Sequence, residues 1–156
     1  TGMGIAVTAA EERQSPTWVA GVVEVTVDPA TGKFSINKIT IAMDPGIAVN
    51  PRNIEAQIRG SALWGASQIM SEKLTLKNGS FEQSNFHDYL PIRLAQVPEI
   101  DVTIIQSNHH PSGVGEPAST IVAPAVANAI ANAVGARVRH MPISPEAVLA
   151  AMKSKA

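Results

Sequence analysis

Apolar and polar residues alternate along the first part of the chain, with one interruption. The alternation runs through TWVAGVVEVTVDP and resumes in FSINKITIAM. A strand that buries one face gives this two-residue period. Between the two runs lies DPATG, in which proline presets φ and glycine accepts a positive φ. The pattern predicts a hairpin over residues 17–43, and residues 3–10 are expected to add a strand to the same sheet.

A helical period replaces the alternation after Asp44-Pro45-Gly46. Asn50 is a suitable N-cap, and Pro51 is favoured in the first turn of a helix. The apolar residues that follow recur at three- and four-residue intervals, which predicts a helix from about residue 51 to residue 72. Gly60 and Gly65 each make this helix about 1 kcal/mol less stable than alanine would. Their presence indicates close approach of another element or of a ligand.

The middle of the chain contains a second turn signal. Asn78-Gly79, between the short segments 73–77 and 80–83, is typical of a tight hairpin. The stretch SNFHDYLPIRLAQVPE is expected to form a structured loop. Residues 100–107, IDVTIIQS, are expected to form a strand.

The last segment predicts two more helices. One is expected over residues 118–134 and ends at Gly135, a favourable C-cap. A short strand is expected at residues 137–140, and a C-terminal helix begins at Ser144-Pro145-Glu146. Strands and helices mix without regular alternation. The sequence therefore predicts one domain, residues 1–156, of the α+β class, in which a mixed sheet with hairpins packs against two longer helices and a short C-terminal helix.

Composition narrows the class of protein. Hydrophobic residues make up 45% of the chain and charged residues 16%, which argues against disorder. The formal net charge of -1 gives no electrostatic basis for binding nucleic acid or an anionic membrane. Because the chain lacks cysteine, it holds no disulfide, thiolate zinc site or iron–sulfur cluster of its own. Prolines, asparagines and a glycine interrupt its longest uncharged run, so a buried helix is expected there and no membrane span.

One carboxylate, Glu116, lies between a glycine-rich turn and a long apolar segment. It follows Gly113-Val114-Gly115, where glycines allow the backbone to approach a ligand closely. The N–H groups at the start of the next helix can hold an anion or a polar edge of a cofactor. If the Glu116 side chain points into an apolar cleft, it can act as a general base. The alternative is an acid that only complements the helix dipole, and the spacing alone favours that alternative.

A polar and small-residue stripe follows one face of the first helix. Gln57 and Ser61 are four residues apart and share a face, and Gly60 and Gly65 lie nearby. Such a stripe is suited either to a cofactor or to contact with another helix. Small residues in helices usually serve packing, so the pattern alone favours helix contact.

Other titratable residues make weaker candidates. A metal site needs three or four converging ligands, and neither His87-Asp88-Tyr89 nor His109-His110 has the spacing of a zinc site. The stretch GVGE lacks the spacing of a dinucleotide or phosphate loop. Ser119 has no nucleophile elbow around it, which leaves no basis for a hydrolase.

Three segments in order carry a resemblance to a known family: DPGIAVNPRNIEAQIRGSALWGAS, NGSFEQSNFHDYLPIRLAQVPEIDV and SGVGEPASTIVAPAVANAIANAVGARVRHMPI. This order resembles the C-terminal end of the large, molybdenum-binding subunit of the xanthine dehydrogenase and aldehyde oxidase family. The chain is most similar to the isoquinoline 1-oxidoreductase β-subunit branch, which includes aldehyde and nicotinate dehydrogenases. The similarity extends from about residue 18 onward.

The resemblance implies roles for particular residues. The glutamate of the family's GVGEP motif is the base beside the molybdenum, and here it corresponds to Glu116. Gly113, Val114 and Gly115 would approach the cofactor through their backbone. The family's QxxG helix motif, which contacts the pterin, corresponds to Gln57 and Gly60. The metal is held by dithiolene sulfurs of the pterin, so no residue of this chain is expected to ligate it.

The resemblance also implies a setting. The expected activity is oxidation of aldehydes or hydroxylation of N-heterocycles with oxygen from water, with molybdopterin cytosine dinucleotide as cofactor. Expected partners are the remainder of the large subunit, a [2Fe-2S] small subunit and a cytochrome c. As the C-terminal portion of a longer molybdopterin-binding domain, the isolated chain is expected to be inactive. The expected location is the periplasm or the periphery of the inner membrane, with the cytoplasm as alternative.

A rival function stays open. The fold could serve a non-catalytic assembly or interaction module of the same complex. Its Pro- and Gly-rich loops and its short length fit such a role.

Overall fold

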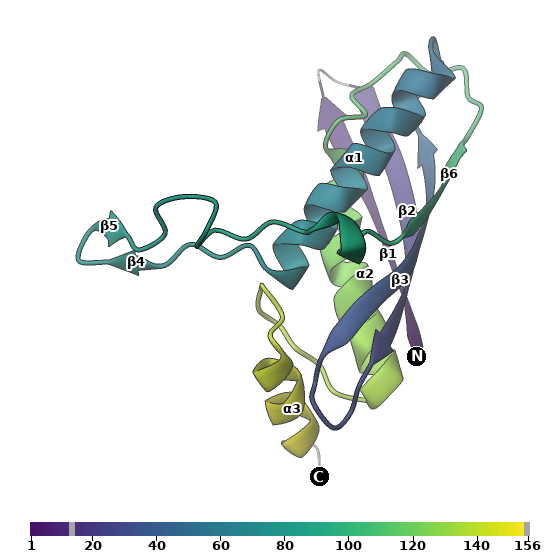
Figure 1. The fold of residues 1–156 in the computed structure, drawn as a ribbon. Coiled ribbons are helices and arrows are strands. Elements are labelled where there is room, and N and C mark those ends of the chain that lie inside the picture. The colour runs from purple at the N-terminus through teal and green to yellow at the C-terminus, as the bar shows by residue number, and fades with distance from the viewer. Residues whose placement is uncertain (13–14, 155–156) are drawn as a thin grey trace.

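A four-stranded sheet forms the centre of the computed structural model, which describes residues 1–12 and 15–154. The strands lie in the order β1-β2-β3-β6, with bounds Gly2–Glu12, Ser15–Val27, Phe34–Asp44 and Glu99–Ile104. The pairs β1–β2 and β2–β3 are antiparallel, whereas β6 runs parallel to β3. Helices α1 (Pro51–Met70) and α2 (Pro117–Val134) lie against one face of this sheet (Figure 1). The predicted α+β class with a mixed sheet is confirmed.

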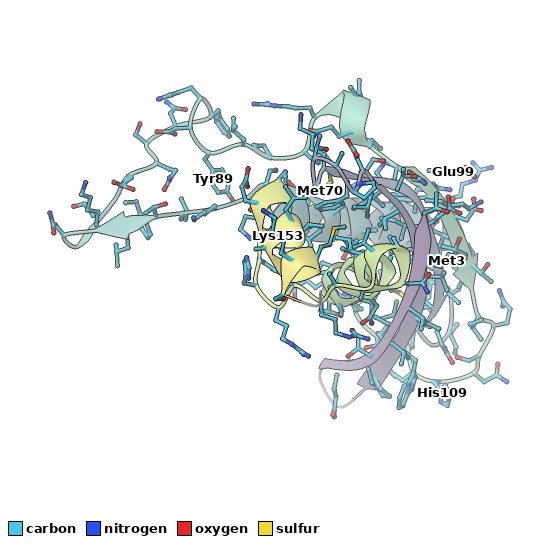
Figure 2. All side chains as sticks on the ribbon, turned by 90° about the horizontal axis from the view of Figure 1, so that it is seen from below. Met3, Met70, Tyr89, Glu99, His109 and Lys153 are labelled. Atoms are coloured by element: carbon cyan, nitrogen blue, oxygen red, sulfur yellow. The ribbon has the colours of Figure 1, made fainter. Side chains whose placement is uncertain are left out.

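An arm, residues 71–98, leaves this body and returns to it, and its hairpin end projects away from the body (Figure 1). It carries the two-stranded hairpin of β4 (Leu76–Lys77) and β5 (Ser80–Phe81), and a 3₁₀ turn, η1 (Leu94–Gln96). Asn78 and Gly79 both have positive φ, 51° and 81°, as the predicted tight turn requires. Figure 2 shows Tyr89 on this arm, well away from the sheet.

The β2–β3 hairpin confirms the alternation in the sequence. Val23, Val25 and Val27 are buried, and the polar residues between them are more exposed. The Asp28 carboxylate closes the turn by accepting hydrogen bonds from Ala30 N (2.9 Å) and Thr31 Oγ1 (2.7 Å).

A β-bulge explains a break in the period of β3. Ile36 and Ile39 are both buried although they are three positions apart, which an uninterrupted strand would not allow. The pairing shifts register between Glu24 and Val25, and Asn37 falls at the shift. An extra residue in one strand returns the following side chains to the core face.

Helix α2 packs closely on β1 and β2 because small residues meet at the contact. A Cβ atom on Gly4 would overlap the backbone of Ala125 and Ala129, so only glycine lets the helix lie this near. By length and hydropathy alone α2 could also cross a membrane, a test that buried helices of other domains pass too. Its buried side chains join one core with β2, β3 and α1.

The helix ends follow the predicted caps. Asn50 Oδ1 accepts a hydrogen bond from Asn53 N (3.2 Å) at the start of α1. Gly135 ends α2 with φ of 69°. Ser144 caps α3 (Pro145–Lys153) through Ala147 N (3.2 Å). Helix α1 ends at Met70, two residues earlier than predicted, and β6 ends at Ile104 instead of residue 107.

The predicted strand at residues 137–140 is wrong: these residues form no strand. Val138 is buried, but Ile143 N donates to Ile69 O (2.8 Å), which directs the segment along the end of α1. Residues 138–141 and Ile143 share a cavity lining with Ile69 and Pro124 of the two long helices. The segment therefore lies beside helices, where no strand is available to pair with it.

Candidate functional site

The loop that leads to Glu116 is fixed to the sheet by buried polar groups. Thr17 and Ser15 at the start of β2 are both buried, and their hydroxyls donate to carbonyl groups of this loop. Thr17 Oγ1 donates to Gly113 O (2.8 Å), and Ser15 Oγ donates to His110 O (2.9 Å). In the opposite direction, Ser112 Oγ of the loop donates to Ser15 O (2.6 Å). Paired polar groups of this kind hold a loop in one conformation.

Asp44, at the end of β3, fixes the beginning of the same loop. Its carboxylate accepts hydrogen bonds from Ser107 Oγ (2.6 Å) and Gly46 N (3.0 Å). The bond from Ser107 and then the bond from Gly46 hold the pKa of Asp44 below its ordinary value. The ionised form of Asp44 is thus the one that the folded loop stabilises.

Glu116 is the residue at which the loop becomes α2. It occupies the N-cap position with φ of -114° and ψ of -29°, and its side chain makes no capping hydrogen bond. Pro117 follows at the first helical position. The exposed Glu116 carboxylate is therefore not needed to close the helix end.

A cavity of about 510 Å³ lies between α1 and the start of α2. This volume is within the range of small-molecule and cofactor sites. The lining consists of Gln57, Gly60, Ser61, Trp64, Gln68, Gly115, Glu116, Ser119 and Thr120. It places one carboxylate among amide and hydroxyl groups, an arrangement that can orient a polar ligand and accept a proton from it.

The glycines around this cavity differ in what they contact. A Cβ atom on Gly65 would lie 2.7 Å from Ser119 O and 2.9 Å from Val122 Cβ, so packing of α1 on α2 requires this glycine. A Cβ on Gly60 would meet nothing within 4 Å. A Cβ on Gly115 would meet only the Gln57 Nε2 atom, at 3.4 Å. Packing within the described residues does not require the last two glycines, which leave the cavity open.

The structure brings four of the six predicted site residues together. Glu116, Gln57, Gly60 and Gly115 line the same cavity. Gly113 and Val114 do not line it.

The other two predicted residues serve the loop and the core. Gly113 O accepts the Thr17 hydroxyl, and Val114 packs against the core. Val114 also lines a neighbouring cavity of about 220 Å³, which it shares with Gln57.

Three lining residues were missed by the sequence analysis. They are Trp64, Gln68 and Thr120. Trp64 is 73% exposed, unusual for an indole. Trp64 and Gln68 follow Gln57 by seven and eleven residues, so the helical period places all three on one face and was the available signal.

The histidines do not line this cavity. Within the described part of the chain, no three His, Asp or Glu side chains converge on a common point. His87 Nε2 lies 3.6 Å from Asp88 Oδ2 on the arm. Backbone N–H groups of Asn85 and Ser84 lower the pKa of Asp88, which indicates a turn-forming role for that carboxylate.

Residues 5–98 match the molybdopterin cofactor-binding domain. The chain belongs to this family. The match covers β1 to the end of the arm, including Gln57 and Gly60, and the family's relatives extend the similarity over Glu116.

Two relatives span almost all of the chain. A membrane-bound aldehyde dehydrogenase [pyrroloquinoline-quinone] from Gluconacetobacter polyoxogenes is 44% identical over 154 residues, which are 99% of this chain and 20% of the relative. The isoquinoline 1-oxidoreductase subunit beta from Brevundimonas diminuta is 33% identical over 97% of this chain and 19% of its own length. The chain thus spans about a fifth of the length of these relatives.

A solved structure has the same fold. The aldehyde oxidoreductase from Desulfovibrio desulfuricans aligns with a TM-score of 0.76 and 29% identity, over 88% of this chain and 16% of that protein. The resemblance to molybdenum-binding subunits of this family is confirmed.

Proposed function

We propose that this chain forms one wall of the cofactor site of a molybdenum-dependent oxidoreductase, and that Glu116 is its general base. The observation that carries the proposal is the convergence of Glu116, Gln57 and two glycines on one cavity. The proposed reaction is oxidation of an aldehyde or hydroxylation of an N-heterocycle with oxygen from water. Membership in the molybdopterin cofactor-binding family supports it.

The lining residues fit a large polar cofactor. A Cβ on Gly60 would meet nothing within 4 Å, and one on Gly115 would meet only the Gln57 amide, so both glycines leave room beside the cavity. The Gln57 amide can both donate and accept hydrogen bonds. We assign these three residues to cofactor contact, with Gly113 and Val114 shaping the loop. The bound cofactor supplies the metal centre that takes two electrons from the substrate.

Glu116 supplies the proton chemistry. Its carboxylate is free of a capping bond, and it stands at the edge of the cavity. As general base it accepts one proton at a carboxylate oxygen when oxygen from water is transferred to the substrate.

Replacing Glu116 by glutamine in the assembled enzyme tests the assignment. Loss of a general base should lower kcat at least ~10²-fold, with the molybdenum content unchanged. Glu146→Gln is the matched control, because Glu146 is an acid in the first turn of α3 and does not line the cavity. Full turnover of Glu116→Gln with complete molybdenum loading would contradict the proposal.

The matched family and one relative are named for different cofactors. One relative is named for pyrroloquinoline quinone, whereas the matched domain is named for molybdopterin. We propose molybdopterin, in its cytosine dinucleotide form. Metal analysis and nucleotide analysis of the purified enzyme should find molybdenum and CMP, and a quinone without molybdenum would refute this choice.

The proposed setting follows the same relatives. The chain would be the C-terminal portion of a molybdopterin-binding domain, completed by the rest of the large subunit, and would be inactive alone. A [2Fe-2S] subunit and a cytochrome c would carry electrons away. The name of one relative includes "membrane-bound", which supports a location in the periplasm or at the inner membrane.

The second candidate is an assembly or interaction module. The exposed apolar side chains of the arm favour it, namely Leu74, Leu76, Phe81, Phe86, Leu90 and Leu94. A complex purified without molybdenum, from cells that load related enzymes, would support the module over the enzyme.

A further inference from the structure

One face of α1 follows the segment that carries Glu116. Gln57, Ser61 and Gly65 are spaced four residues apart, so they lie on the same side of the helix. Gln57 approaches Gly115, and Gly65 lets α2 come close at Ser119. Ser61, between them, faces the start of α2.

The Ser61 hydroxyl joins the two helices at Glu116. Ser61 is 7% exposed, and its Oγ donates to Glu116 O at 3.1 Å. The same Oγ accepts a hydrogen bond from Ser119 N at 2.9 Å. This buried hydroxyl therefore donates one hydrogen bond and accepts another, both with the backbone at the start of α2.

Among the described residues, the other donors to Glu116 O come from within α2. They are Ser119 N (2.9 Å) and Ser119 Oγ (2.8 Å). These bonds shape the first turn but do not fix it relative to α1, where Gln57 lies. Ser61 alone supplies a hydrogen bond from α1 to this carbonyl group in the described structure.

We propose that Ser61 is a positioning residue for the Glu116 carboxylate; the inference rests on the proposed function of Glu116. Because the Glu116 side chain makes no capping bond, its position follows from its backbone. Without the Ser61 hydroxyl, the start of α2 can shift relative to α1. Misplacement by about 1 Å can reduce a rate 10²-fold, so even a partial shift is measurable.

The test uses the assembled enzyme, the variant Glu116→Gln and four further variants. Ser61→Ala should lower kcat about 10-fold, with KM within about 2-fold of wild type and molybdenum content unchanged. Ser61→Thr retains a hydroxyl and should recover most of the loss. Ser67→Ala is the matched control: Ser67 is on the same helix and is 2% exposed, but its hydroxyl accepts from Ile92 N of the arm, at 2.8 Å. This control should keep wild-type kcat.

The fourth variant combines Ser61→Ala with Glu116→Gln. If Ser61 acts through Glu116, adding Ser61→Ala to Glu116→Gln should lower the rate no further than Glu116→Gln alone does. Additive losses would overturn the inference, as would a loss that tracks molybdenum content or equals that of Ser67→Ala. Wild-type kcat of Ser61→Ala beside an inactive Glu116→Gln would also overturn it while leaving the proposed function intact. An active Glu116→Gln would refute the proposed function, and this inference with it.

Discussion

Replacing either glycine of α1 by alanine should change the free energy of unfolding, and the two changes should have opposite signs. Gly60 and Gly65 lie in the same helix, five residues apart, and both can be replaced by alanine. A methyl group at Gly60 would point into the open cavity, whereas one at Gly65 would enter the contact between α1 and α2. The same substitution therefore tests two different surroundings.

The magnitudes follow from helix propensity and from space. Alanine is favoured over glycine inside a helix by about 1 kcal/mol, and at Gly60 nothing within 4 Å opposes this gain. At Gly65 the new Cβ would lie 2.7 Å from Ser119 O, so the helices must separate. Overpacking of this kind costs about 1–3 kcal/mol. The free energy of unfolding should therefore rise by about 1 kcal/mol in Gly60→Ala and fall by up to ~2 kcal/mol in Gly65→Ala.

Urea unfolding of the 156-residue chain, followed by circular dichroism, measures both effects. In the assembled enzyme, Gly60→Ala should carry less molybdenum than wild type although it is the more stable variant, because its methyl group occupies space assigned to the cofactor. Full molybdenum content in Gly60→Ala would refute the assignment of Gly60 to cofactor contact. A Gly65→Ala variant with a higher free energy of unfolding than wild type would refute the account of helix packing.

Two further predictions concern the supports of the site. Asn50→Ala removes the cap that accepts from Asn53 N and should lower the free energy of unfolding by about 1 kcal/mol, measured by the urea midpoint; an unchanged midpoint would exclude the cap as a stabilising contact. The pKa of Asp44 is lowered in the folded chain by the Ser107 hydroxyl and Gly46 N–H, so its contribution is complete above the ordinary pKa of about 3.9 and is lost as pH falls through the lower folded value. Asp44→Asn should therefore show a smaller loss of stability than wild type on acidification below about pH 4, and identical pH profiles would contradict this role.

Local patterns predicted most of the elements. The alternation in residues 17–43 and the caps at Asn50, Gly135 and Ser144 act within a few residues, so the sequence alone contains them. The prediction of a strand at residues 137–140 was wrong because a strand must pair with a neighbouring strand. Ile143 is instead bound to the end of α1, a tertiary contact that local pattern cannot contain.

The site was predicted in part for the same reason. The shared face of Gln57 and Ser61 follows from the helical period, and the same period reaches Trp64. The difference between Gly60 and Gly65 depends on where α2 lies across α1. Of the two alternatives for the small-residue stripe, helix contact is found at Gly65. Gly60 faces open space, and its contact with a cofactor stays a prediction.

The role of Glu116 is tested most directly by a single turnover. The fully loaded enzyme is mixed with excess substrate without oxygen, and reduction of its cofactor is followed by stopped-flow absorbance. Glu116→Gln should reduce the rate of this step at least ~10²-fold, while reduction by dithionite stays at the wild-type rate. An unchanged rate of reduction by substrate would contradict the assignment of Glu116 as the base.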